Sequence, residues 1–278
     1  MRWINIFRIH VTLLKQAEVI ELCKKWLKEP GQHHIVTANP ETLLLVRKDQ
    51  WLNDIVRGAS IITADGFGVC WAATFFETSA SVDSIYAVLK IFLKTLFNLL
   101  FRKETNGRSI PERVSGSDLL WKLVEIAKNE NKKIYLMGGT NGTARRAAEK
   151  INLFYPEINI AAFEPDHEAT PYATYELNNE IEDYSPDIVF VAYGTPKQEE
   201  WINQNLSRFK SIKIAMGVGG ALDFIAGNTS RAPLRLQNHG LEWFWRFTQR
   251  PTRIFRVLRA IVEFPIFILL SRLKRLYG

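Results

Sequence analysis

The chain has 278 residues, of which 47% are hydrophobic, and its formal net charge is +7. A chain of this length can bury the core of one large α/β domain, with or without an appendage, and nothing in it indicates two enzymes. Its two cysteines, Cys23 and Cys70, lie far apart, which excludes a disulfide framework and a cysteine-rich metal cluster and predicts a reduced, cytosolic protein.

The predicted elements alternate between strands and helices along the chain. Residues 1–10 alternate like a strand and lack the apolar core of a signal peptide, so we do not expect secretion. Apolar strand-like runs follow at His34–Ala38, Ser60–Thr63, Lys133–Met137, Asn159–Phe163, Asp187–Ala192 and Lys213–Val218. Helical spacing is found at Pro40–Val56, Gly66–Phe76, Ser117–Asn129, Thr143–Tyr155, Tyr172–Tyr184 and Lys197–Asn205. This alternation predicts an α/β fold: a Rossmann-like, doubly wound, mostly parallel sheet with helices on both faces.

The positive charge belongs to residues 231–278, which we interpret as a helical appendage to a core of residues 1–230. The appendage has a net charge of +8 and the core a net charge of −1. Arginines and apolar residues alternate there at helical spacing near Trp243 and Trp245, which is typical of a basic amphipathic helix at a lipid interface. A nucleic-acid arm is disfavoured by the interleaved aliphatic residues and the lack of a binding signature. We expect an anionic membrane surface or substrate to meet this segment, and no nucleic acid.

The most informative motif runs from Asp187 to Trp201. A strand buried on both faces leads directly into Gly194-Thr-Pro and then into a helix that opens with Lys197, Gln198 and Glu199. Open parallel sheets bind their ligands at the carboxyl ends of strands. On these residues alone, an ordinary strand-to-helix turn fits equally well.

Short polar residues follow two other predicted strands. Thr37 and Asn39 precede a helix that Pro40 starts, and Asp65 follows an apolar run and precedes Gly66. All three residue types cap helices well, so capping is one interpretation. The other is a substrate site in which Asp65 acts as a general base.

Two further segments favour phosphate binding. Gly138 and Gly139 lie between a strand and a helix, where backbone amides and the helix dipole can hold a phosphate or ribose. They lack the spaced glycine fingerprint of NAD sites. The guanidinium of Arg113 matches phosphate oxygens, although it can equally pair with Glu112 or Asp118 and only hold the loop.

Six motifs in one order resemble those of the WecG/TagA/CpsF glycosyltransferases (glycosyltransferase family 26), from about Ile35 to Arg259. They are Thr37–Thr42, Ile62–Gly68, Glu112–Asp118, Leu136–Gly139, Gly194–Glu199 and Gly217–Asp223. The resemblance implies an inverting transferase that moves a hexosamine of the N-acetylmannosamine type from a UDP-sugar. The implied acceptor is polyprenyl-diphosphate-linked and lies on the cytoplasmic face of the membrane, and the product enters cell-wall, teichoic-acid or exopolysaccharide synthesis.

The resemblance also assigns roles to individual residues. It implies Asp65 as the catalytic base, Thr37 and Asn39 as donor-sugar contacts, and Gln198 as a contact to uracil or sugar hydroxyls. Three tail arginines are implied to fold over the cleft and neutralise the leaving diphosphate: Arg246, Arg253 and Arg256. Asp223 is expected to anchor a turn.

Relative to the family pattern, residues 79–110 look like an insertion. Ile85 to Phe101 reads as an apolar helix with Lys90, Lys94 and Asn98 at steps of four, and it falls short of a membrane span. We favour an amphipathic helix lying in the membrane plane over a helix packed against a partner subunit. Homo-oligomerisation is therefore an open possibility.

Neither a metal nor another cofactor is expected, because no D-x-D motif occurs. The nearest acidic cluster, Asp166 to Glu168, is typical of solvated charge, and this loop departs from the family pattern. A non-catalytic nucleotide-binding module that recruits a membrane polysaccharide-assembly complex is the alternative function. An NAD-dependent oxidoreductase lacks its fingerprint.

Overall fold

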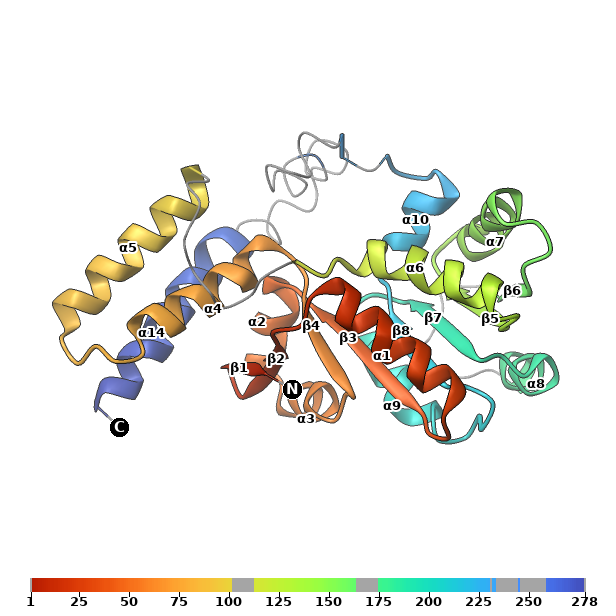
Figure 1. Ribbon diagram of the computed structural model, residues 1–278, viewed down its shortest axis with the longest axis horizontal. Coiled ribbons are helices and arrows are strands. Elements are labelled where there is room, and N and C mark those ends of the chain that lie inside the picture. The colour runs from red at the N-terminus through yellow and green to blue at the C-terminus, as the bar shows by residue number, and fades with distance from the viewer. Residues whose placement is uncertain are drawn as a thin grey trace.

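The computed structural model describes residues 2–101, 113–163, 175–230, 232–233, 245 and 259–277. Among them, six parallel strands form one sheet in the order β4-β3-β8-β7-β5-β6 (Figure 1). The strands are β3 (His33–Ala38), β4 (Ile61–Ala64), β5 (Ile134–Gly138), β6 (Ile160–Phe163), β7 (Ile188–Ala192) and β8 (Ile214–Gly217). The predicted α/β class and parallel sheet are confirmed.

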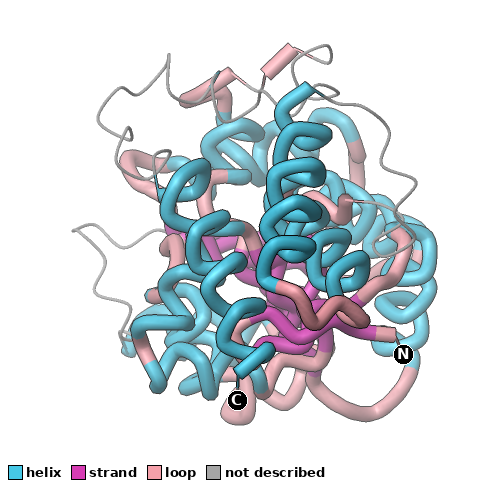
Figure 2. The backbone as a smooth tube through the Cα atoms, turned by 90° about the vertical axis from the view of Figure 1, so that its left-hand side faces the viewer, coloured by secondary structure: helices cyan, strands magenta, loops and turns pink. Residues whose placement is uncertain are grey.

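Helices cover both faces of the sheet, because alternate residues of a strand point to opposite sides (Figure 2). One face packs against α1 (Gln16–Lys28), α6 (Gly116–Asn129), α7 (Thr143–Phe154) and α10 (Ala221–Ala226). The other packs against α2 (Pro40–Lys48), α3 (Gln50–Arg57), α4 (Phe67–Ser79), α8 (Tyr175–Tyr184) and α9 (Lys197–Asn205). Ile35 is thus buried on the first face and its neighbour Val36 on the second.

Two local predictions are wrong in detail. The single helix predicted over Pro40–Val56 is two helices, because Asp49 caps α3 by accepting a hydrogen bond from the backbone N–H of Leu52 (3.1 Å). The single strand predicted over residues 1–10 is a hairpin of β1 (Trp3–Ile6) and β2 (Ile9–Thr12). Its turn places Phe7 and Arg8 at positive φ without a glycine to signal it.

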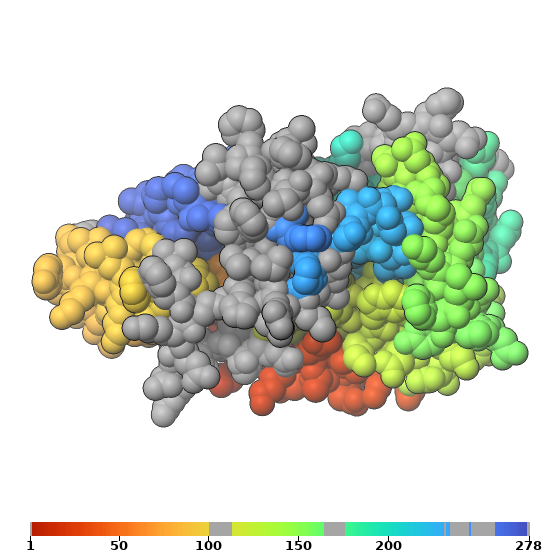
Figure 3. Space-filling view, turned by 90° about the horizontal axis from the view of Figure 1, so that it is seen from above, coloured from red at the N-terminus to blue at the C-terminus, as the bar shows by residue number. Residues whose placement is uncertain are grey.

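Two helices form one end of the molecule beside α4. They are α5 (Ile85–Phe101) and α14 (Phe264–Tyr277), which the π-helix η2 (Arg259–Glu263) precedes. Figure 3 shows both at the end opposite α7. No helix within the described ranges is long and apolar enough to cross a membrane.

The C-terminal helix packs into the core of the fold. Phe264 and Ile268 are fully buried in the cluster that includes α2 and α4. The buried guanidinium of Arg272 donates hydrogen bonds to the carbonyl oxygens of Ser79 (2.6 Å) and Val82 (2.7 Å), where α4 ends. The last described helix is therefore fixed to α4, and the boundary at residue 230 stays a prediction.

Candidate active site

The candidate site lies along the carboxyl edge of the sheet. Thr37 is near the end of β3, Asp65 directly follows β4, and Gly138 ends β5. Gln198 is the second residue of α9, which follows β7. Because parallel strands point the same way, their ends bring these residues to one edge, as the sequence predicts.

Asp65 is held between two strands and the start of a helix. Its backbone N–H donates to the carbonyl oxygen of Ala38 (2.9 Å), and its Oδ2 accepts from the backbone N–H of Gly116 (3.4 Å). Gly116 is the first residue of α6, whose partial positive charge at this end stabilises a carboxylate. Asp65 does not cap α4, the helix that follows it, because Gly66 occupies the N-cap position of that helix.

Gly116 also lies against Thr37, next to the Asp65 carboxylate. A Cβ atom on Gly116 would lie 2.8 Å from Thr37 Oγ1, so the backbone of α6 approaches this side chain as closely as a glycine permits. Thr37 and Asp65 therefore both lie against Gly116. The site gains a hydroxyl and a carboxylate that come from neighbouring strands.

Asn39 has the capping role that the sequence allows, and its role as a substrate contact stays a prediction. Its Oδ1 accepts a hydrogen bond from the backbone N–H of Thr42 (2.9 Å) and caps α2. The amide oxygen is thus engaged in capping. The amide nitrogen is the group through which Asn39 would reach a substrate.

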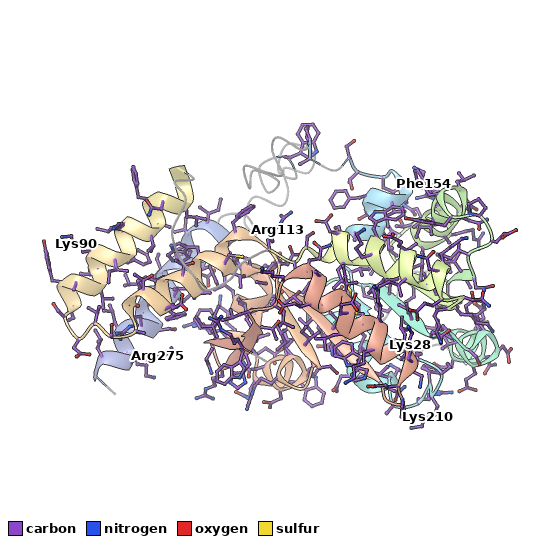
Figure 4. The ribbon with its side chains drawn as sticks, in the orientation of Figure 1. Lys28, Lys90, Arg113, Phe154, Lys210 and Arg275 are labelled. Atoms are coloured by element: carbon purple, nitrogen blue, oxygen red, sulfur yellow. The ribbon has the colours of Figure 1, made fainter. Side chains whose placement is uncertain are left out.

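Arg113 lies between α4 and α6 (Figure 4). Its guanidinium is 5.4 Å from the centre of the Phe67 ring, and Phe67 opens α4 two residues after Asp65. Burial raises the pKa of the nearby Cys70 thiol to about 12. The charge of Asp65 adds to this increase, and the charge of Arg113 opposes it. These opposite effects indicate that a negative and a positive side chain flank the same part of the site.

Gln198 joins the loops that follow β7 and β8. Its Oε1 accepts hydrogen bonds from the backbone N–H groups of Gly194 (3.1 Å) and Gly219 (3.0 Å). A Cβ atom on Gly217 would clash with the Gln198 side chain, so a larger residue there would displace this amide. The amide oxygen of Gln198 therefore holds both loops together.

Glu199 is the buried acid of the site. Its Oε1 accepts from Gln198 Nε2 (2.9 Å) and from Thr195 Oγ1 (3.2 Å), and its buried Oε2 has no hydrogen-bond partner among the described residues. Burial raises the pKa of this carboxyl to about 7, although the hydrogen bond from Gln198 acts in the opposite direction. The hydrogen bond that Gln198 Nε2 donates to Glu199 thus fixes the orientation of the Gln198 amide.

The glycines after β5 are also tightly enclosed. Gly138 has a φ of +90°, and a Cβ atom there would lie 2.7 Å from the Tyr193 ring. Gly139 donates its N–H to the carbonyl oxygen of Ala192 (3.2 Å), which ties this turn to the end of β7. As predicted, Asp223 anchors a turn, because its Oδ1 accepts from Asn228 Nδ2 (3.1 Å).

Some of the predicted residues lie outside the described part of the chain. These are Arg246, Arg253 and Arg256, together with the acidic loop from Asp166 to Glu168. In the described residues, no group of three or more His, Cys, Asp and Glu side chains could hold a metal ion. The roles of the arginines and the expectation that no metal is needed both stay predictions.

Two residues of the site lie within the sequence motifs but were given no role there. The contacts of Gly116 cannot be read from the motif, because its partners Thr37 and Asp65 are more than 50 residues away. Glu199 opens a helix, where an acid ordinarily faces solvent and the helix dipole. A sign of its burial is its position three residues before the buried Ile202.

Glycine turns and short polar side chains at the carboxyl edge of a doubly wound sheet define an α/β enzyme of the kind that binds its ligand at this edge. The chain matches the model of the glycosyl transferase WecG/TagA/CpsF family over residues 4–94 and 96–277. It belongs to this family and is a glycosyltransferase. The resemblance seen in the sequence is confirmed.

Curated relatives agree with this assignment. One is the N-acetylglucosaminyldiphosphoundecaprenol N-acetyl-beta-D-mannosaminyltransferase of Staphylococcus aureus (strain MRSA252), which is 31% identical over 233 residues, 84% of this chain and 77% of the relative. The protein of the same name from strain MW2 is 30% identical over the same shares.

Proposed function

We propose that this glycosyltransferase moves a hexosamine of the N-acetylmannosamine type from a UDP-sugar to a polyprenyl-diphosphate-linked acceptor. The sugar and the lipid-linked acceptor correspond to the names of the relatives, and UDP is the donor that the motifs imply. The product would enter cell-wall or exopolysaccharide synthesis. The observation that carries the proposal is the Asp65 carboxylate, which lies at the carboxyl edge of the sheet beside Thr37 and at the start of α6.

In the proposed reaction Asp65 acts as the general base. It takes the proton from the acceptor hydroxyl as that oxygen forms a bond to the anomeric carbon, and the bond from this carbon to the UDP oxygen breaks. Direct attack on one face inverts the anomeric centre. Thr37 and the amide nitrogen of Asn39 are suited to hold hydroxyl or acetamido groups of the donor sugar.

Charge on the leaving diphosphate needs cations or hydrogen-bond donors. We assign this role to Arg113 and to the tail residues Arg246, Arg253 and Arg256. The backbone around Gly138 and Gly139, next to the start of α7, would contact phosphate or ribose. Gln198 would add a hydrogen bond from its nitrogen to uracil or to a sugar hydroxyl.

A lipid-linked acceptor requires the enzyme to work at the membrane surface. We therefore propose a peripheral position on the cytoplasmic face, where anionic lipids attract the basic residues 231–278. The tail arginines would reach the cleft from that surface.

The test is release of UDP from a panel of UDP-sugars by the full chain, with and without a short-chain polyprenyl-diphosphate-GlcNAc acceptor in detergent. We expect release that depends on the acceptor. The variant Asp65→Asn should reduce turnover by at least about 100-fold, because general base catalysis is worth ~10²–10⁴. UDP binding and the unfolding midpoint should stay close to those of the wild type.

The matched control is Asp54→Asn, which removes an exposed carboxylate from α3 and should leave turnover unchanged. Full activity in Asp65→Asn would remove Asp65 from the mechanism. Nucleotide binding without release for every donor would instead support the module that recruits a membrane complex.

A further inference from the structure

The helix α5 is fixed to the fold by one of its faces. Val88 and Phe92 are buried against α4. The Phe92 ring packs edge to face with the rings of Trp71 and Phe75, at centroid separations of 5.6 Å and 5.5 Å. The indole N–H of Trp71 donates to Thr95 Oγ1 (3.2 Å) in the same interface. These contacts set which side of α5 points outward.

The outward side carries a continuous apolar stripe. Ile85, Leu89, Leu93 and Phe97 recur at steps of four, so they lie along one line of the helix, and all four are exposed. Tyr86, beside this line, is 77% exposed, and Leu93 is 64% exposed. Large apolar side chains gathered in this way mark an interaction surface.

The charged residues of α5 are both lysines. Lys90 and Lys94 are exposed along one border, and Figure 4 shows Lys90 pointing away from the rest of the molecule. No acidic residue occurs from Ile85 to Phe101, although Glu77 and Asp83 lie shortly before this helix. The adjoining α14 contacts α5 and also has basic residues but no acid.

The helix α14 adds a second exposed stripe at the same end of the molecule. Val262, in η2, is followed at steps of four by Ile266 and Leu270, all three exposed, and then by the exposed Lys274. Both helices thus combine exposed apolar side chains with exposed lysines.

This pattern distinguishes between two partners for the exposed surface, a second copy of the chain and a lipid surface. In a symmetric dimer the same patch meets itself, so the lysines of one copy would face a surface that offers no acid on α5 or α14. An anionic lipid surface supplies an acyl boundary for the apolar stripe and negative headgroups for the lysines beside it.

We propose that the exposed stripe of α5, with Lys90 and Lys94 at its border, is a lipid-contacting surface. The helix lies in the membrane plane, its apolar stripe enters the boundary between headgroups and acyl chains, and its lysines reach anionic headgroups. This surface belongs to α5, outside residues 231–278, and its contact with lipid needs neither donor nor acceptor. It therefore does not rest on the proposed reaction.

The first experiment measures binding of the full chain to vesicles of phosphatidylcholine with and without phosphatidylglycerol, by flotation. Substituting Lys90→Gln and Lys94→Gln together should weaken binding to the anionic vesicles about 25-fold, since each cation near such a surface contributes about fivefold. Leu93→Ser with Phe97→Ser should weaken it by at least about tenfold, because two apolar side chains no longer enter the lipid.

Matched controls lie at the opposite end of the molecule. Leu153→Ser with Phe154→Ser changes two exposed apolar residues of α7, and Lys28→Gln with Lys210→Gln removes two exposed cations (Figure 4). We expect both double variants to bind vesicles like the wild type. Equal losses in the controls would overturn the assignment to α5.

A second measurement distinguishes lipid contact by α5 from lipid contact by residues 231–278. A polarity-sensitive fluorophore is attached to Leu93→Cys or, as the control, to Leu153→Cys. Cys23 is fully buried, and burial raises the pKa of both native thiols to about 12, so the introduced thiol is the one that reacts.

Anionic vesicles should shift the emission to the blue at position 93 and leave position 153 unchanged. An unshifted signal at 93 while the protein binds vesicles would mean that other segments hold the lipid. Failure of the wild type to bind vesicles, or a dimer that Leu93→Ser with Phe97→Ser dissociates, would also refute the proposal.

Discussion

Replacing Glu199 with Gln tests whether the buried acid of the site holds a proton. Glu199 is 3% exposed, and its Oε2 has no hydrogen-bond partner within the described structure. A charged carboxylate at such a place is costly, whereas a protonated one is tolerated. Burial accordingly raises the pKa from 4.5 to about 7. Gln keeps the oxygen that accepts from Gln198 and Thr195 but cannot titrate.

The size and sign of the effect follow from this shift. Each pKa unit corresponds to about 1.4 kcal/mol, so the carboxyl accounts for about 3 kcal/mol. Between pH 4.5 and about 7 the folded state keeps a proton that the unfolded state has released. The free energy of unfolding therefore falls as the pH rises through this window, and the full contribution is present below it.

The assay is urea unfolding of wild type and Glu199→Gln over a pH series, followed by tryptophan fluorescence. We expect the difference in unfolding free energy between them to change by about 3 kcal/mol in favour of the variant from low to high pH. Glu200→Gln, one residue further on and half-buried, is the control and should follow the wild type. Parallel profiles for wild type and Glu199→Gln would refute the reasoning.

Three other predictions concern separate parts of the molecule. Arg272→Met leaves the carbonyl oxygens at the end of α4 without their donor, so urea unfolding should show a loss of about 3 kcal/mol, and no loss would contradict the role given to this guanidinium. Gly116→Ala places a methyl group 2.8 Å from Thr37 Oγ1, and we expect kcat to fall roughly tenfold or more in the UDP-release assay; an unchanged kcat would separate this contact from catalysis. Burial lowers the pKa of His34 from 6.5 to about 4, so stability should decline by about 3 kcal/mol as the pH falls through that range, and His34→Gln should lack this decline in urea unfolding.

Much of the fold is encoded in local patterns. The run Ile188–Ala192 is apolar without interruption, and only a sheet covered on both faces buries such a strand, so the parallel architecture follows from the residues themselves. Thr37 and Asp65 became candidates because each lies at or next to the end of such a run, whereas the role of Gln198 was implied by the family motif. Local reasoning failed where polar side chains redirect the backbone, as Asp49 does between α2 and α3.

The tertiary structure decided which of these residues meet. Because β8 lies beside β7, Gly219 reaches the amide oxygen of Gln198, and the start of α6 brings Gly116 to Asp65. Strand order and the docking of α14 depend on how the whole apolar core packs, through contacts between residues far apart in the chain. Periodicity in the sequence records only which side of each element is buried, so it predicts the elements and leaves their partners to the packing of the complete chain.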